Sequence, residues 1–389
     1  MDSAVFFSEF PPIGKAEWLA ALEKSLKGKM PLADLVWAAE ADLDITPLVH
    51  ADDFPEAPLP LTEAPNNWEL SETIRIGANA PEAQAMVQEA LHFGVEGLEL
   101  RFDPSLSSER LAQVLEGVYL DYVGLHLYDV SPTPMPPAAA LAALGGLAQS
   151  KGVSPLALHG TVDFNPAAQQ GIVDWRYTSE CTEMAAAQFP GFRVLHADGR
   201  HLHTTGTVDE LTVLLQLGNQ YLTKMHERGL PPAQTAAQLH FSIAIGDHYF
   251  LEMAKLRAFR QLWLHVLQAW NAPLQYPYIS VSFKPAVYQD DLYTNLIRAT
   301  TMAMSAVLGG ANRLTVMPYD EGREALASYP PAFGRRMARN VQHLLKMESH
   351  LDEAIDAMAG SYYLETLTRQ LGEKTWQRNA EFGIRNAEL

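Results

Sequence analysis

Short apolar runs alternate with amphipathic stretches along most of the chain after residue 82. The runs are rich in β-branched and aromatic residues, which predicts strands, and the stretches between them have the spacing of helices. A strand followed by a helix, repeated many times, is typical of a parallel sheet. We expect strands at residues 97–102, 122–127, 156–162, 192–196, 239–243, 278–283 and 313–317.

Two of the intervening helices are especially clear. One begins after Gly246 and Asp247 and repeats apolar residues at helical spacing up to Val266; the other begins at Asp290–Asp291 and ends at Gly309–Gly310. Over about 250 residues this repetition predicts an α/β fold of the (β/α)8 TIM barrel type. Its eighth strand would be a weak one near residues 354–355. A doubly wound open sheet is the alternative.

Residues 1–66 have a different pattern, which predicts an N-terminal arm with extended and helical parts ahead of a barrel at 67–389. A helix is expected at about residues 15–26, with strand-like pieces at 35–37 and 45–49. Four prolines within residues 55–65 indicate a linker. A helix this short is marginal in water, so its apolar residues need a surface to contact. We expect Trp18, Leu22 and Trp37 to form a partner interface.

Charge and composition narrow the classes of function. The formal net charge of -18 disfavours binding to nucleic acid or to an anionic membrane. The single cysteine, Cys181, excludes an intrachain disulfide framework and favours a reducing compartment. The first ten residues contain no basic residue, unlike a signal peptide, and no apolar run reaches the roughly 20 residues of a membrane span. A cytoplasmic protein is expected.

The common motifs of nucleotide-binding proteins, hydrolases and zinc proteases are absent from the sequence. Histidines, however, fall in four of the expected strands, and further polar residues follow the fourth. At the carboxyl ends of barrel strands such a set could ligate a metal or move protons. The alternative, which we favour, is that they are core or rim histidines satisfied by hydrogen bonds. The residues concerned are His126, His159, His196 and His240, with Asp198, His201 and His203 beyond the fourth strand.

Three ordered blocks resemble the methylmalonyl-CoA mutase family. Residues 239–263, LHFSIAIGDHYFLEMAKLRAFRQLW, resemble a family strand that turns into a helix reading E-x-A-K-x-R-A-x-R-x-L-W. Residues 293–310, YTNLIRATTMAMSAVLGG, match a family helix that ends in A-V-L-G-G. Residues 339–376 contain R-N, E-S-H and G-S-Y-Y in the family order. The resemblance covers roughly residues 67–378 and implies a barrel that, in catalytic members, holds the acyl-CoA through its centre.

The N-terminal segment carries the resemblance further. Residues 5–50, with F-P-P at 10–12, E-W at 17–18, L-K-G at 26–28 and L-V-W at 35–37, look like the arm of small subunits in heterodimeric members. The resemblance therefore implies a small, non-catalytic subunit. Its partner would be a large mutase subunit that binds adenosylcobalamin and interconverts methylmalonyl-CoA and succinyl-CoA. A homodimer is possible for the isolated chain.

The chain also departs from the catalytic pattern. It contains no D-x-H-x-x-G, whose histidine ligates cobalt in the family, and it ends at Leu389, so we expect no cobalamin domain and no cofactor bound by this chain alone. Where catalytic members read S-G-Y-H, this chain has D-G-R-H, with Arg200 and His201. Lys284 lies in a segment that replaces T-H-S-Q-T-S-G-W.

These departures predict a degenerate barrel mouth around Arg200, His201 and Lys284, with no catalytic, cofactor-binding or metal-binding residues. A radical rearrangement needs aligned polar contacts in a dry, shaped cavity, and those contacts are replaced. The chain alone is therefore expected to be inactive. Three alternatives stay open: a truncated catalytic mutase barrel, a barrel enzyme with a metal site at the strand-end histidines, and a barrel that binds some anionic ligand at its altered mouth.

Overall fold

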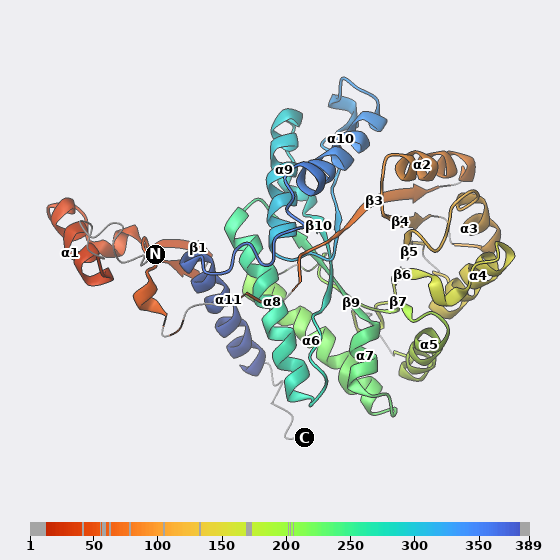
Figure 1. Ribbon diagram of the computed structural model, residues 1–389, viewed down its shortest axis with the longest axis horizontal. Coiled ribbons are helices and arrows are strands. Elements are labelled where there is room, and N and C mark those ends of the chain that lie inside the picture. Colours follow the sequence, from red (N-terminus) through yellow and green to blue (C-terminus); the bar gives the residue numbers. More distant parts are fainter. Residues whose placement is uncertain are drawn as a thin grey trace, which may run out of the picture.

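The computed structural model has a barrel of parallel strands surrounded by helices, with an arm that projects from one side (Figure 1). It describes residues 13–40, 43–54, 56, 60–61, 64–77, 79–103, 106–131, 134–168, 173–200, 202, 204 and 206–381. The strands of the barrel are β3 (Glu69–Ile76), β4 (Gly97–Phe102), β5 (Gly124–Asp129), β6 (His159–Val162), β7 (Gly191–Arg193), β8 (Leu195–Asp198), β9 (Leu239–Ile245), β10 (Tyr278–Phe283) and β11 (Arg313–Thr315).

The strand order closes the sheet into a (β/α)8 barrel. Neighbours in the sheet run β7-β6-β5-β4-β3-β11-β10-β9-β8, and every pair is parallel. The two ends of this order, β7 and β8, are consecutive in the chain and are separated only by Val194. They are two halves of one strand, the first paired with β6 and the second with β9, so eight strand positions form the barrel. The predicted fold class is confirmed.

One predicted strand is wrong. Residues 354–355 lie in bends and turns between the π-helical turn Leu344–Glu348 and α11, not in the sheet. The eighth strand of the barrel is instead β3, which the sequence pattern did not predict; it comes first in the chain and pairs with β4 and β11. Its sequence, ELSETIRI, has polar residues at every inward position, so the apolar pattern that predicts the other strands is weak there.

Helices cover the outside of the barrel and bury the apolar faces of the strands. The predicted helix after Gly246 is α8, and Asp291 caps α9 through hydrogen bonds from the amides of Tyr293 and Thr294. α11 packs on α6 and α8 as an additional outer element. The helices are α2 (Ala80–His92), α3 (Ser108–Val114), α4 (Pro137–Ser150), α5 (Trp175–Gln188), α6 (Thr207–His226), α7 (Pro232–Gln238), α8 (Tyr249–Ala269), α9 (Leu292–Leu308), α10 (Pro331–His343) and α11 (Tyr362–Glu381).

The arm consists of the helix α1 (Lys15–Leu26), a 3-10 turn (Leu32–Leu35) and a two-stranded antiparallel hairpin of β1 (Trp37–Glu40) and β2 (Leu43–Ile45). Leu43 and Ile45 are buried, whereas α1 buries none of its residues. Pro55 and Pro58 of the predicted linker lie outside the described residues. In the described part of the chain, no helix has the length and apolar character needed to cross a membrane.

Candidate functional site

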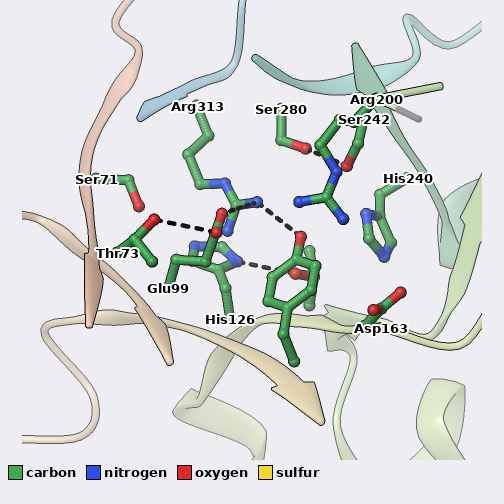
Figure 2. Close-up of polar contacts among 12 residues, drawn as sticks. Ser71, Thr73, Glu99, His126, Asp163, Arg200, His240, Ser242, Ser280 and Arg313 are labelled. Atoms are coloured by element: carbon green, nitrogen blue, oxygen red, sulfur yellow. Dashed lines mark hydrogen bonds and ion pairs between the residues drawn. The ribbon is translucent and has the colours of Figure 1, made fainter. Parts of the chain in front are cut away.

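The interior of the barrel is polar and charged, whereas its outer wall is apolar. In β4, for example, Leu98, Leu100 and Phe102 point outward and are fully buried against helices, while the alternate positions Glu99 and Arg101 point inward. Barrel interiors are usually packed with branched apolar residues. Figure 2 shows that carboxylate, guanidinium, imidazole and hydroxyl groups from several strands instead meet at the centre.

Glu69 blocks the end of the barrel where the strands begin. Its carboxylate lies against Gly97 and Gly124, so that a Cβ at either glycine would collide with it. Its Oε1 atom is 2.6 Å from Nε2 of His126, whose Nδ1 is 3.0 Å from Oγ1 of Thr161. Burial raises the pKa of Glu69, but His126 and Arg313 outweigh it and hold this pKa at about 2. The carboxylate is therefore charged at neutral pH.

Arg313 occupies the centre of the barrel. Only 1% of this residue is exposed, and its Nη2 atom donates a hydrogen bond to Oη of Tyr128 at 3.1 Å and lies 3.5 Å from Oε2 of Glu99. Glu99 also accepts hydrogen bonds from Arg101, at 2.8 Å, and Thr73, at 3.1 Å. Burial raises the pKa of Glu99, but the nearby arginines hold it at about 2. This ion-paired cluster fills the space along the barrel axis.

A chain of hydrogen bonds runs across the other half of the interior. Nδ1 of His196 is 2.6 Å from Oδ1 of Asp163, and its Nε2 is 2.7 Å from Oγ of Ser242. Ser242 continues the chain to Oγ of Ser280 at 2.8 Å. The order Asp, His, Ser resembles a hydrolase triad, but Ser242 is only 1% exposed and a substrate cannot reach it. This row of hydrogen bonds links the end of β6 to β8, β9 and β10.

The strand histidines are not arranged as a metal site. The ring of His240 stacks on that of His196, with centroids 4.2 Å apart, and its pKa is lowered well below the ordinary value by burial and by His196. His126, His196 and His240 are all fully buried and hydrogen-bonded to protein atoms. Among the residues that the structure describes, no group of three or more His, Cys, Asp or Glu side chains could hold a metal ion.

Two of the predicted mouth residues, Arg200 and Lys284, are described; both follow the carboxyl ends of strands, and both are paired with carboxylates. Arg200 donates two hydrogen bonds to Asp198, at 2.9 and 2.8 Å, and its guanidinium lies 4.9 Å from the ring centroid of Tyr128. The Nζ atom of Lys284 is 3.2 Å from Oε2 of Glu210. His201 and His203 lie outside the described residues. Since neither described cation is free, this mouth offers an anionic ligand little attraction.

The charged residues of the helix α8 have a role that the sequence does not reveal. Lys255 is fully buried and contacts Glu252 at 2.6 Å and Glu210 at 3.3 Å, while Arg257 pairs with Asp356 and Glu365. These pairs attach α8 to α6, to the loop before α11 and to α11 itself. The sequence does contain one sign of these pairs: charged residues lie on the apolar face of α8, and buried charges need partners of opposite charge.

Comparison with known proteins identifies the family. The family model described as methylmalonyl-CoA mutase matches residues 106–382, well over half of the chain. The chain belongs to the methylmalonyl-CoA mutase family. It is 30% identical over 95% of its length to a methylmalonyl-CoA mutase small subunit from Porphyromonas gingivalis, of which it covers 63%. It is also 30% identical to the methylmalonyl-CoA mutase small subunit from Streptomyces virginiae; this match covers 96% of the present chain and 64% of that protein.

The large subunit from Streptomyces virginiae is also similar, with 28% identity over 95% of this chain and 56% of that protein. The chain therefore spans less than two thirds of the length of these relatives. Methylmalonyl-CoA mutases form a cobalamin-dependent family, in which a histidine ligates cobalt. The barrel histidines do not fit that role, because His126, His196 and His240 are fully buried. Both ring nitrogens of His126 and His196 are hydrogen-bonded, and Nδ1 of His240, which makes no hydrogen bond to a described residue, is closed off from solvent.

Proposed function

We propose that this chain is a non-catalytic barrel subunit that pairs with a large, cobalamin-bearing mutase subunit. The partner would interconvert methylmalonyl-CoA and succinyl-CoA with adenosylcobalamin. The observation that carries the proposal is the filled centre of the barrel, where Arg313, Glu99 and His126 occupy the space that a catalytic member needs for its substrate.

The cost of opening this centre supports the proposal. A pantetheine chain along the axis would displace Arg313 from Glu99 and Glu69 from His126. Separating the buried Arg313–Glu99 ion pair costs about 3–5 kcal/mol. Burial and Arg313 lower the pKa of His126, so its contact with Glu69 is a hydrogen bond to a neutral imidazole. A CoA thioester would have to supply this energy from new contacts, and the cations at the described mouth are already paired with carboxylates. A stable structural role is the simpler outcome.

The arm supports the pairing part of the proposal. We divide the chain into an arm with its linker, residues 1–66, and a barrel, residues 67–389. Trp18 and Leu22 of α1 are partly exposed, and Trp37 of the hairpin is 52% exposed, so the arm presents apolar area to a neighbour. The relatives named as small and large subunits suggest what that neighbour is.

The first test is cofactor binding and turnover by the isolated chain. We expect no binding of adenosylcobalamin by calorimetry and no conversion of methylmalonyl-CoA, with activity appearing only after a large subunit is added. The large subunit alone serves as the control. A one-to-one complex of the isolated chain with the cofactor at micromolar affinity would contradict the proposal. Turnover by the chain alone would support a catalytic barrel instead.

The second test concerns the arm as the surface for the large subunit. Trp18→Ala is expected to weaken assembly with that subunit about tenfold, because an interfacial aromatic side chain typically contributes more than 1 kcal/mol of binding energy. Affinity can be measured by calorimetry on the co-expressed pair. Leu156→Ala removes an apolar side chain that is 60% exposed, more than that of Trp18, elsewhere on the protein and should leave the affinity unchanged. Equal affinities for both variants would show that α1 is not the interface.

A further inference from the structure

The helix α6 begins without a cap of its own. Gly206 occupies its N-cap position and, as a glycine, has no side chain that could accept a hydrogen bond from the first turn. Glu40, which lies 167 positions earlier in the chain, supplies the acceptor instead. Its Oε2 atom accepts a hydrogen bond from the amide of Thr207 at 2.8 Å, and its Oε1 accepts one from the Thr207 hydroxyl at 2.6 Å. A carboxylate at this place satisfies an unpaired amide and is favourable for the helix dipole.

The β1–β2 hairpin, which carries Glu40, also contacts the start of a second helix. Trp37 stacks on the imidazole of His248, the residue before α8, with ring centroids 6.4 Å apart. Leu43 and Ile45 of β2 are buried as part of the hydrophobic core. Because α6 follows β8 and α8 follows β9, both helix starts lie at the carboxyl end of the barrel. The hairpin is therefore attached beside the barrel mouth.

The first turn of α6 also balances the charge of the mouth. Glu210, three residues after Thr207, lies 3.2 Å from Nζ of Lys284 and 3.3 Å from Nζ of Lys255. Lys255 is fully buried, whereas the side chain of Lys284 is 43% exposed. Among the described residues, Glu210 is the only carboxylate that pairs with Lys284. A displacement of Glu210 therefore leaves an accessible cation without its counter-charge.

We propose that the β1–β2 hairpin is a latch that sets the charge of the barrel mouth. While Glu40 caps α6, the first turn of the helix is closed and Glu210 neutralises Lys284. When the hairpin leaves α6, this turn loses its cap and frays, because helix ends open first and an amide without an acceptor favours water. Glu210 then separates from Lys284, and the mouth gains a cation that an anion can contact. Every contact of this latch lies within one chain, so it does not depend on the proposed pairing with a large subunit.

Amide hydrogen exchange of the full chain, followed by mass spectrometry, tests the latch. Glu40→Ala should speed exchange in residues 207–212 about tenfold, as expected for the loss of a helix cap, and should also speed exchange in the hairpin. Acetylation of Lys284 by limiting acetic anhydride should become about threefold faster, since a half-exposed ion pair is released. Asp44→Ala removes a carboxylate from the exposed side of the same hairpin and should change neither rate.

A cap restored within α6 separates capping from a general loss of packing. Gly206 has an extended backbone, with φ −178° and ψ −179°, and of the described residues only Glu40 lies within 4 Å of an added Cβ. In Glu40→Ala that obstacle is gone, so adding Gly206→Asp should cap the helix locally. Exchange in residues 207–212 and acetylation of Lys284 should return to wild-type rates, while exchange in the hairpin stays fast.

Two results would overturn the proposal: unchanged exchange at 207–212 in Glu40→Ala, or a double variant that reacts as fast as the single one at Lys284. Neither measurement includes the large subunit, so failure here leaves the proposed function standing.

Discussion

Replacing Arg313 by leucine is expected to lower the free energy of unfolding by about 3–5 kcal/mol, the usual effect of removing one member of a buried ion pair. The guanidinium is 1% exposed and lies 3.5 Å from Glu99, and leucine leaves that carboxylate with Arg101 as its nearest cation. The hydroxyl of Tyr128 also loses a donor. Urea unfolding at pH 7, followed by tryptophan fluorescence, measures the change.

Arg75→Leu is the matched control. Arg75 also comes from a barrel strand and pairs with a carboxylate, Glu321, but its side chain is 72% exposed. Exposed ion pairs contribute about 0–1 kcal/mol, so this variant should be nearly as stable as the wild type. Adding Glu99→Gln to Arg313→Leu should recover part of the loss, because it removes the carboxylate that lacks its partner. Equal losses at positions 75 and 313 would mean that the interior is hydrated and open.

Arg313→Leu should also change how the stability of the protein depends on pH in the acid range. The pKa of Glu99 is about 2 in the folded protein against an ordinary value of 4.5, so its contribution to stability is present above about pH 4.5 and is lost as the pH falls towards 2. Removing Arg313 raises the folded pKa of Glu99 and therefore reduces this contribution, although Arg101 still holds part of it. Stability should depend less steeply on pH in this window for Arg313→Leu than for the wild type.

The sequence predicts most of the wall of this barrel because that wall is apolar. The outward residues of β4 and the long apolar face of α8 create the periodic pattern, and the strand at 97–102 and the helix after Gly246 lie where the pattern places them. The β3 strand was missed because its inward residues are polar and one of its outward positions is also charged: Glu72 interrupts the apolar row of Leu70, Ile74 and Ile76. A residue pattern cannot reveal that a strand closes the sheet from the opposite end of the chain.

The interior is less predictable, because its function depends on which side chains meet across the barrel. Arg313 and Glu99 are more than 200 residues apart in the chain, and neither stands in a recognisable motif. The histidines were singled out, but their partners, Glu69 and Asp163, were not. Arg200 and Lys284 were expected at the mouth. Their pairing with carboxylates could not be predicted, because it depends on where β8 places Asp198 and where α6 places Glu210.

A second large effect is expected at Lys255, whose replacement by methionine should cost about 3–5 kcal/mol of stability. Lys255 is fully buried between Glu210 and Glu252 and also donates to the carbonyl of Ala244 at 3.0 Å. Burial alone would lower the pKa of Lys255, but the two neighbouring glutamates raise it by more, so the net pKa lies above its ordinary value. Because the folded pKa exceeds the ordinary 10.5, its contribution is fully present at neutral pH and is lost only at more alkaline pH.

Methionine fills nearly the same volume as lysine, so the loss should come from charge and not from packing. Without Lys255, Glu252 keeps no ion-pair partner among the described residues, and Glu210 keeps, among them, only the half-exposed Lys284. Lys224→Met, which breaks an exposed pair with Glu227, should change the free energy of unfolding by less than about 1 kcal/mol. Adding Glu210→Gln and Glu252→Gln to Lys255→Met should restore most of the stability. If that triple variant is as unstable as Lys255→Met, the ammonium acts through its hydrogen bond to Ala244, and the two glutamates are not what makes it necessary.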